Sequence, residues 1–197
     1  MNKIDYNAKM KEIISNLTDR PKLLLHSCCA PCSSSVLQRI KEYFDVTVLY
    51  YNPNIYPEEE YFKRKQEQIK LLNILNIKLM DCDYIPEEYY QKVAGYECEK
   101  EGGARCEKCF YLRLEKAAQL ATNNGFDFFG TTLTVSPHKN AEIINRIGEE
   151  LEKKYGIKFL YSDFKKEDGY LNSIKLSKEY NLYRQEYCGC EFSKPQK

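Results

Sequence analysis

Seven of the nine cysteines fall into three tight groups that lie far apart in the chain. The groups are Cys28, Cys29 and Cys32, then Cys106 and Cys109, and finally Cys188 and Cys190. Thiolates bind soft metals and iron–sulfur clusters, and paired thiols also carry electrons by forming disulfides. Three groups separated by long stretches of α/β pattern therefore predict one site, assembled in space, that binds metal, runs disulfide exchange, or does both.

The first two groups have spacings that suit metal binding. Cys106 and Cys109 are two residues apart at the predicted start of a helix, where the helix N-terminus favours the thiolate. Cys28 and Cys29 are adjacent, and a disulfide between neighbours strains the peptide, but both sulfurs can bind one polynuclear centre. Four such thiolates suit either tetrahedral zinc or an iron–sulfur cluster. A zinc site alone would leave the other three grouped cysteines without a role.

The third group has a different chemistry. Only one residue separates Cys188 from Cys190, so a disulfide between them would close a small, strained ring that is easily reduced. Such a pair suits electron relay better than structural cross-linking. Cys82 and Cys98 stand alone and are interpreted as incidental. The basic run 63–65 is interpreted as a solvated helix face, and His26 either as a ligand of the site or as a buried, hydrogen-bonded side chain.

Composition bounds the class of protein. A chain of 197 residues with 43% hydrophobic content suits one α/β domain over residues 1–197, with a C-terminal tail at 183–197 that carries the third cysteine group. A net charge of +1 gives no sign of a polycation. We expect a cytoplasmic protein, because the start lacks an export signal and no run suits a membrane span. Cytoplasmic thiols stay reduced, which favours metal or redox chemistry over structural disulfides.

Strand and helix patterns alternate along the chain. The predicted strands cover residues 22–26, 46–50, 77–80, 126–130 and 157–161. Helical periodicity follows each of them, at about 36–44, 58–75, 110–121, 143–151 and 169–180. This alternation predicts right-handed βαβ crossovers and a mostly parallel sheet of about five strands. Sites in such folds form beyond the carboxyl ends of the strands. Three segments are therefore expected to converge: 28–32, 131–139 and 162–163.

Several ordered motifs together resemble a known family. They are His26–Cys32, Tyr51–Ile55, Glu101–Cys106 with Cys109–Phe110, Thr131–Leu133 with Ser136–Lys139, and Tyr183–Cys190. From about residue 23 to residue 193, the sequence resembles the cobalamin-independent epoxyqueuosine reductases of the QueH type. That family completes queuosine biosynthesis in tRNA by reductive deoxygenation of epoxyqueuosine.

The resemblance implies a Rossmann-like three-layer fold related to the adenine-nucleotide alpha-hydrolase group. It also implies a [4Fe-4S] cluster held by Cys28, Cys29, Cys106 and Cys109, and a redox-active pair at Cys188 and Cys190. One additional iron ion beside the cluster is allowed, with Cys32 as its candidate ligand. The implied partners are tRNA carrying epoxyqueuosine and an external electron donor, with no membrane. No glycine-rich phosphate signature follows the first strand, so nucleotide binding is not expected.

Two other functions stay open from the sequence. A thioredoxin-like thiol oxidoreductase would use Cys29 and Cys32 at a strand-to-helix turn and would need no iron. A non-catalytic zinc-binding module would hold one zinc ion without redox activity. For the reductase, the candidate proton donors are Tyr187, His26 and Asp163.

Overall fold

A five-stranded parallel sheet forms the centre of the molecule, in the order β3-β2-β1-β4-β5. The computed structural model describes residues 4–194 of the chain. The strands are β1 (Lys22–His26), β2 (Asp45–Tyr50), β3 (Lys78–Asp81), β4 (Phe128–Thr131) and β5 (Lys158–Phe159). β1 lies in the middle and pairs with β2 on one side and β4 on the other, so its carboxyl end is flanked by theirs.

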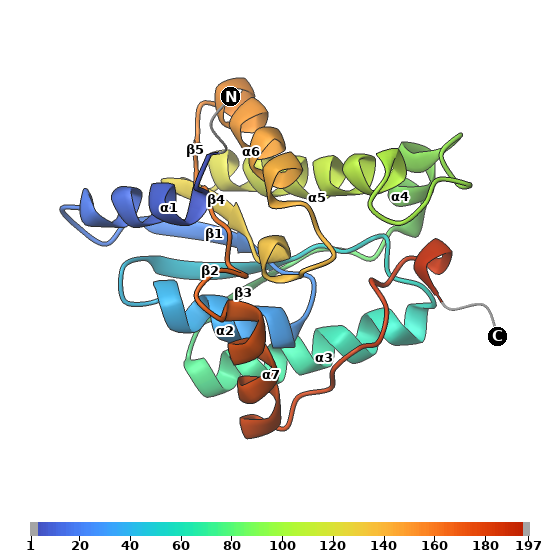
Figure 1. Ribbon diagram of the computed structural model, residues 1–197, viewed down its shortest axis with the longest axis horizontal. Coiled ribbons are helices and arrows are strands. Elements are labelled where there is room, and N and C mark those ends of the chain that lie inside the picture. Colours follow the sequence, from blue (N-terminus) through green and yellow to red (C-terminus); the bar gives the residue numbers. More distant parts are fainter. Residues whose placement is uncertain (1–3, 195–197) are drawn as a thin grey trace.

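Helices cover both faces of the sheet and give three layers (Figure 1). They are α1 (Tyr6–Ser15), α2 (Ala30–Ile40), α3 (Glu58–Leu75), α4 (Pro86–Val93), α5 (Ala104–Asn123), α6 (Ala141–Tyr155) and α7 (Gly169–Glu179), with short 3₁₀ turns at Leu133–Val135 and Glu191–Ser193. α5 and α6 lie on one face, and α2, α3 and α7 lie on the other. After α7 the chain runs back across α3 towards α4 (Figure 1).

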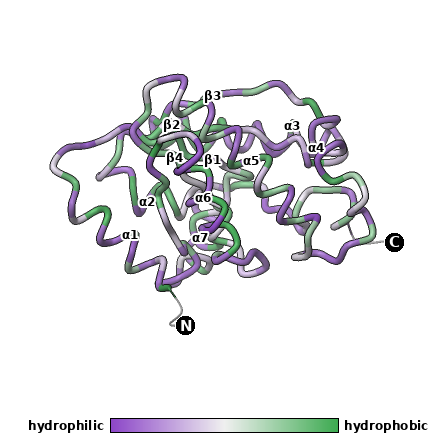
Figure 2. Tube along the Cα trace, turned by 90° about the horizontal axis from the view of Figure 1, so that it is seen from above, coloured by the Kyte–Doolittle hydropathy of each residue, from purple (hydrophilic) through white to green (hydrophobic). Residues whose placement is uncertain are grey.

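The core has one half on each face of the sheet. Along β1, Leu24 packs with the α5 and α6 side, while Leu23 and Leu25 pack with the α2 side. This alternation follows from the two-residue repeat of a strand, and burial of both faces explains the unbroken apolar run at 23–25. Figure 2 shows the same result, with hydrophobic residues concentrated on the central strands.

The predicted fold class is confirmed. β1 and α3 have the bounds expected from the sequence, whereas β5 is shorter than the predicted 157–161. α1 and α4 were not predicted. Of the predicted tail 183–197, residues 195–197 lie outside the described part, as do residues 1–3 of the chain start. Within residues 4–194, no helix is both long and apolar enough to cross a membrane.

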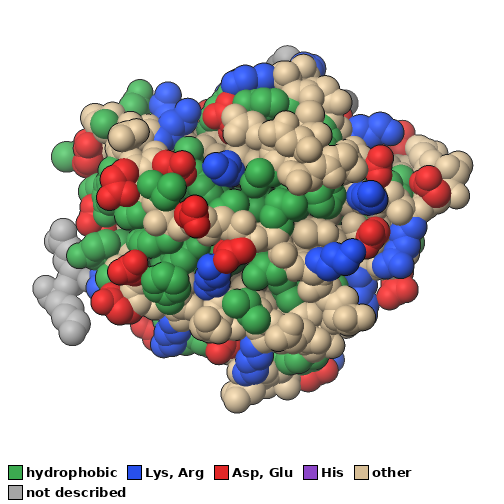
Figure 3. All heavy atoms as spheres, turned by 180° about the vertical axis from the view of Figure 1, so that it is seen from behind, with side chains coloured by type: hydrophobic (Ala, Val, Ile, Leu, Met, Phe, Trp, Pro, Cys, Tyr) green, Lys and Arg blue, Asp and Glu red, His purple; other side chains and the backbone are tan. Residues whose placement is uncertain are grey.

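The surface carries both signs of charge. On the rear face, acidic and basic side chains are interspersed with hydrophobic ones, several of which gather left of the centre (Figure 3). Exposed large hydrophobic residues include Tyr56, Phe62, Ile85 and Tyr90. This mixture agrees with the net charge of +1 and shows no single-sign field on that face.

Gly148 on α6 is expected to tolerate no side chain. A Cβ atom built there would lie 2.2 Å from the ring of the buried Phe159. Overpacking of this kind costs about 1–3 kcal/mol, which exceeds the gain of about 1 kcal/mol that alanine brings to a helix. Gly148→Ala should therefore lower the free energy of unfolding by up to about 2 kcal/mol in a denaturant titration. In the double variant, Phe159→Leu should recover part of the stability that Gly148→Ala loses. If the two changes in the free energy of unfolding were additive, the contact between positions 148 and 159 would be contradicted.

Candidate active site

The first cysteine group lies at the carboxyl end of β1, where the chain turns into α2. Cys29 is the N-cap of α2, and Cys32 lies in the first turn. The sulfur atoms of Cys28, Cys29 and Cys32 all lie within 4.8 Å of one another, and those of Cys28 and Cys29 are 3.8 Å apart. Within residues 4–194, no other three side chains of the Cys, His, Asp and Glu types form such a group. Cys32 is therefore as close to the adjacent pair as a shared metal centre requires.

These three thiols differ in pKa. Hydrogen bonds from the thiols of Cys29 and Cys32 lower the pKa of Cys28 well below its usual range, and the charges of Lys139 and Arg113 lower it further. The hydrogen bond to Cys28, with burial, raises the pKa of Cys29 to about 11. The group thus favours one thiolate before any metal is bound, and thiolate is the form that binds metal.

Cys106 and Cys109 lie in the first two turns of α5. The backbone N–H of Gly102 donates to the Cys106 sulfur at 3.2 Å. Gly102 has a φ of +88°, a conformation that L side chains rarely adopt, so this approach depends on the glycine. Arg105 steadies the preceding loop by donating to the carbonyl oxygens of Glu97 and Glu99. The loop before α5 therefore presents a hydrogen-bond donor to a candidate ligand.

The third cysteine group packs against the second inside the protein. Cys190 is 6% exposed and packs in one cluster with Cys109, Tyr89 and Val93. Burial raises the pKa of Cys109 to about 12, and the nearby sulfurs of Cys188 and Cys190 add to this rise. All nine cysteines are free thiols in this structure. The fold therefore brings cysteines from positions near 30, 106 and 190 into one neighbourhood.

Arg64 holds the segment that carries Cys188 and Cys190. Its guanidinium pairs with Glu60 at 2.7 Å and donates to the carbonyl oxygens of Cys188 at 3.1 Å and Tyr187 at 3.4 Å. The Arg64 residue is 2% exposed. The interpretation of 63–65 as a solvated face is therefore wrong for Arg64, which faces inward and fixes the C-terminal segment on α3.

A cavity of about 340 Å³ lies between the first and third cysteine groups. Its lining residues follow the carboxyl ends of β1 and β4 or lie in the starts of α2 and α7, the loop before α5 and the C-terminal segment: Cys28, Cys32, Glu101, Ser136, His138, Lys139, Tyr170, Arg184, Gln185, Glu186, Tyr187, Cys188 and Ser193. The predicted convergence of residues 28–32 and 131–139 is confirmed at this cavity. Residues 162 and 163 do not line it. Glu101, Tyr170 and Ser193 had no individual signal in the sequence.

His26 is a satisfied buried side chain. Its Nδ1 lies 3.0 Å from the Thr131 hydroxyl and its Nε2 lies 3.2 Å from the Tyr51 carbonyl oxygen. Burial lowers the pKa of His26 to about 3, so the ring is neutral at physiological pH. Because both ring nitrogens already have partners, this arrangement favours the interpretation of His26 as a buried, hydrogen-bonded side chain over that as a ligand of the site. Asp163 is paired with Lys165 at 2.7 Å. Tyr187 is the candidate proton donor that lines the cavity.

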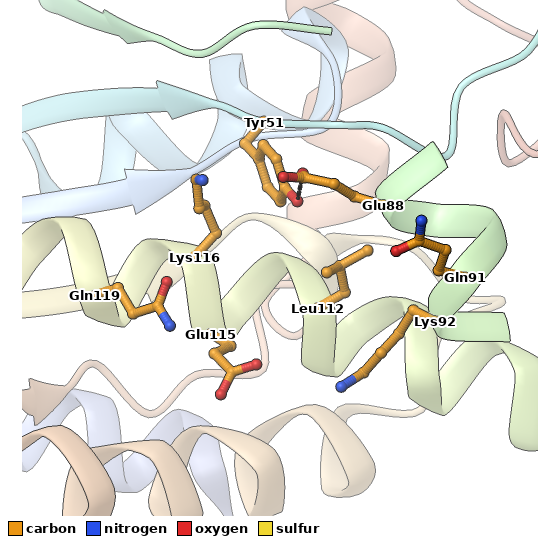
Figure 4. Close-up of a pocket in the computed structure, with 8 residues that line it drawn as sticks. All are labelled: Tyr51, Glu88, Gln91, Lys92, Leu112, Glu115, Lys116 and Gln119. Carbon is orange, nitrogen blue, oxygen red and sulfur yellow. Dashed lines mark hydrogen bonds between the residues drawn. The ribbon is translucent and has the colours of Figure 1, made fainter. Parts of the chain in front are cut away.

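A second cavity lies away from the grouped cysteines. It measures about 370 Å³ and lies between α4 and α5 (Figure 4). The Tyr51 hydroxyl donates to the Glu88 carboxylate there, and the Lys116 ammonium lies 5.3 Å from the Tyr51 ring centroid. An adjoining cavity of about 350 Å³ shares these three residues and includes Cys82. Cys82 therefore belongs to a different region from the three groups.

The sulfur atoms of the three cysteine groups suit an iron–sulfur cluster. Buried cysteine sulfurs are soft ligands, and the site offers several of them within one neighbourhood. The Nη2 atom of Arg113, buried beside them, has no hydrogen-bond partner, although buried donors are nearly always paired. A sulfur-rich anionic group bound between the cysteines would provide that partner. The residues therefore fit the implied cluster.

Comparisons with known proteins agree on one family. The family described as Epoxyqueuosine reductase QueH matches residues 23–196. The relative of that name from Staphylococcus epidermidis is 42% identical over 202 residues, covering 97% of this chain and 85% of its own. The one from Thermotoga maritima is 41% identical over 174 residues, covering 87% of this chain and 89% of its own.

A solved structure shows the same fold at greater distance. The U34-tRNA thiolase NcsA from Methanococcus maripaludis, solved with its [4Fe-4S] cluster, superposes with a TM-score of 0.54. Its identity is 13%, with 95% of this chain and 68% of that chain covered, so this likeness concerns the fold. The sequence relatives cover most of the chain at more than 40% identity, and they decide the assignment. The chain belongs to the epoxyqueuosine reductase QueH family.

Proposed function

We infer that this protein is a cytoplasmic oxidoreductase that converts epoxyqueuosine in tRNA to queuosine. The observation that carries the inference, in a member of this family, is the convergence of separate cysteine groups on one cavity at the carboxyl ends of β1 and β4. That cavity, of about 340 Å³, can enclose part of one nucleoside turned out of an RNA loop.

The reaction sets a definite demand on the site. Both carbon–oxygen bonds of the epoxide break, the two carbons form a double bond, and the oxygen leaves as water. This step consumes two electrons and two protons. Lys139 lines the cavity and can hydrogen-bond to an oxygen that gains negative charge there. Tyr187 also lines the cavity, but its hydroxyl donates to the Tyr56 carbonyl oxygen at 2.6 Å and would have to leave that partner to serve as the proton donor. Arg184, also in the lining, offers a positive charge for a phosphate of the bound strand.

We assign the cluster ligands to Cys28, Cys29, Cys106 and Cys109, with Cys32 as the candidate ligand of one additional iron ion. A bound [4Fe-4S] cluster would supply electrons singly. The hydrogen bond from Gly102 to Cys106 and the clustering of Cys28 and Cys29 support these assignments.

The Cys188 and Cys190 pair can meet the demand for two electrons. When two thiols become a disulfide they release two electrons and two protons, the amounts that the epoxide reduction consumes. An external reductant would then restore the dithiol. Cys188 lines the cavity and Cys190 packs in one cluster with Cys109, so the pair adjoins both the substrate space and one of the proposed ligands.

The test begins with anaerobic purification and measurement of iron, acid-labile sulfide and the visible spectrum before and after dithionite. The cluster assignment requires about four irons with sulfide and an absorption band that bleaches on reduction. Deoxygenation is then followed on tRNA containing epoxyqueuosine, by loss of one oxygen from the released nucleoside. Cys188→Ser should keep the cluster and lose multiple turnover, while Cys98→Ser, at an exposed thiol, should change neither.

Other outcomes separate the alternatives. A tightly held zinc ion without iron would point to the zinc-binding module and contradict the reductase. Protein that stays metal-free after anaerobic reconstitution, but reduces disulfides, would point to the thiol oxidoreductase. If Cys188→Ser converted the tRNA at the wild-type rate, the Cys188 and Cys190 dithiol would not be the electron source of the reaction.

A further inference from the structure

Arg113 is a buried cation without a carboxylate partner. It lies on α5 one turn after Cys109, and its residue is 1% exposed. Its Nε donates to the Cys109 carbonyl oxygen at 3.2 Å, and its Nη2 has no partner. None of the salt bridges within residues 4–194 involves Arg113. Burying a guanidinium in this way is unfavourable unless an anion compensates its charge.

The groups whose charge can act on Arg113 are the site's own sulfurs. Burial alone would lower the pKa of Arg113, but interaction with the sulfurs of Cys109, Cys188, Cys28 and Cys106, in their charged form, raises it. Members of all three cysteine groups thus lie within electrostatic reach of one guanidinium. The packing of α5 against the sheet places this charge inside the protein, and Arg113 is absent from the cavity lining.

A second cation, Lys139, faces the same sulfurs from the cavity. It lines the cavity, and the charges of Cys188, Cys28 and Cys32 raise its pKa against the effect of burial. The two cations therefore differ in position: Lys139 is half-buried in the cavity lining, whereas Arg113 is buried and absent from that lining. Water in the cavity screens the charge of Lys139. The charge of the buried Arg113 keeps its strength when the cavity contents change.

We propose that Arg113 is the internal counter-cation of the cluster, a positioning residue whose charge makes the cluster easier to reduce and whose Nη2 donates to a sulfur atom there. The proposal rests on the proposed function. Four thiolates give a [4Fe-4S] cluster a net negative charge that grows by one on reduction. A fixed positive charge beside it in a poorly polarisable interior stabilises the reduced form more than the oxidised one. Hydrogen bonds to cluster sulfurs act in the same direction.

The test is a redox titration of the isolated enzyme without tRNA, followed by the electron paramagnetic resonance signal of the reduced cluster. Arg113→Lys keeps the charge, and Arg113→Gln keeps a donor without the charge. Arg113→Gln should lower the equilibrium constant for one-electron reduction at least tenfold, a shift of about 59 mV to more negative potential. Arg113→Lys should stay near the wild type. Lys116→Gln, on the same helix but facing the cavity of Figure 4, is the matched control and should leave the potential unchanged.

Each outcome decides the proposal. Loss of the cluster in Arg113→Gln, with retention in Arg113→Lys, would support it, because charge then decides assembly. A wild-type potential in Arg113→Gln would overturn it. Failure of Arg113→Lys to fold or to bind the cluster would also overturn it, because the shape of the side chain would then matter rather than its charge. A wild-type protein without iron and sulfide would instead refute the proposed function, so the two failures are distinguishable.

Discussion

Replacing Cys106 by alanine is expected to abolish cluster binding and tRNA deoxygenation. Cys106 lies in the first turn of α5, and its sulfur accepts the Gly102 N–H at 3.2 Å. Removing that sulfur leaves one corner of a four-iron cluster without its protein ligand and the Gly102 donor without an acceptor. Iron and sulfide per chain, measured after anaerobic reconstitution, should fall from about four of each to the background of a metal-free sample.

The control for this prediction lies in the loop before α5. Cys98 is exposed, and Cys98→Ala removes a thiol without removing a proposed ligand. This variant should hold the wild-type amount of iron and show the same spectrum. Full iron and sulfide in Cys106→Ala would show that Cys106 is not a ligand, and the nearby Cys32 would become the leading candidate for its place.

Arg64→Met is expected to destabilise the folded protein strongly. The substitution leaves Glu60 without its buried partner and removes the donors to the carbonyl oxygens of Tyr187 and Cys188. Breaking a buried pair from one side costs about 3–5 kcal/mol. The free energy of unfolding should fall by about that amount in urea, and the buried Cys190 thiol should react faster with iodoacetamide.

Lys63→Met is the matched change on the exposed side of the same helix turn. Lys63 lies 3.5 Å from the Tyr183 ring centroid, a contact worth about 0.5–1 kcal/mol at an exposed site. Its stability and thiol reactivity should stay near the wild type. Equal losses in the two variants would show that Arg64 does not hold the C-terminal segment in place.

The sheet and the place of the site were predictable because their signals are local. Short runs such as 23–25 and 46–50 carry apolar, β-branched or aromatic residues at the positions that the helices on the two faces of the sheet bury. Parallel strands put their carboxyl ends at one edge, which is why cysteines after β1 meet residues after β4. α1 and α4 were missed, although Asp5 caps the first and Pro86 opens the second.

The charged residues of the site could not be predicted, because their burial depends on distant parts of the chain. Arg64 is buried by a segment more than 120 residues later, and nothing in the run 63–65 distinguishes it from its exposed neighbour Lys63. Arg113 shares the helical spacing of the inward face of α5 with Phe110 and Ala117, but nothing local shows that it meets sulfurs from three separate groups. Only the tertiary structure separates these two arginines from the others.

The attachment of the C-terminal segment to α3 also sets an order of assembly. During synthesis, the strands, the first two cysteine groups and Arg64 all leave the ribosome before Cys188 and Cys190. The nascent protein therefore passes through a stage in which the earlier cysteines have been synthesised and the segment that packs against Cys109 has not. Iron delivered at that stage would meet an open site, and the arrival of the last segment would close it.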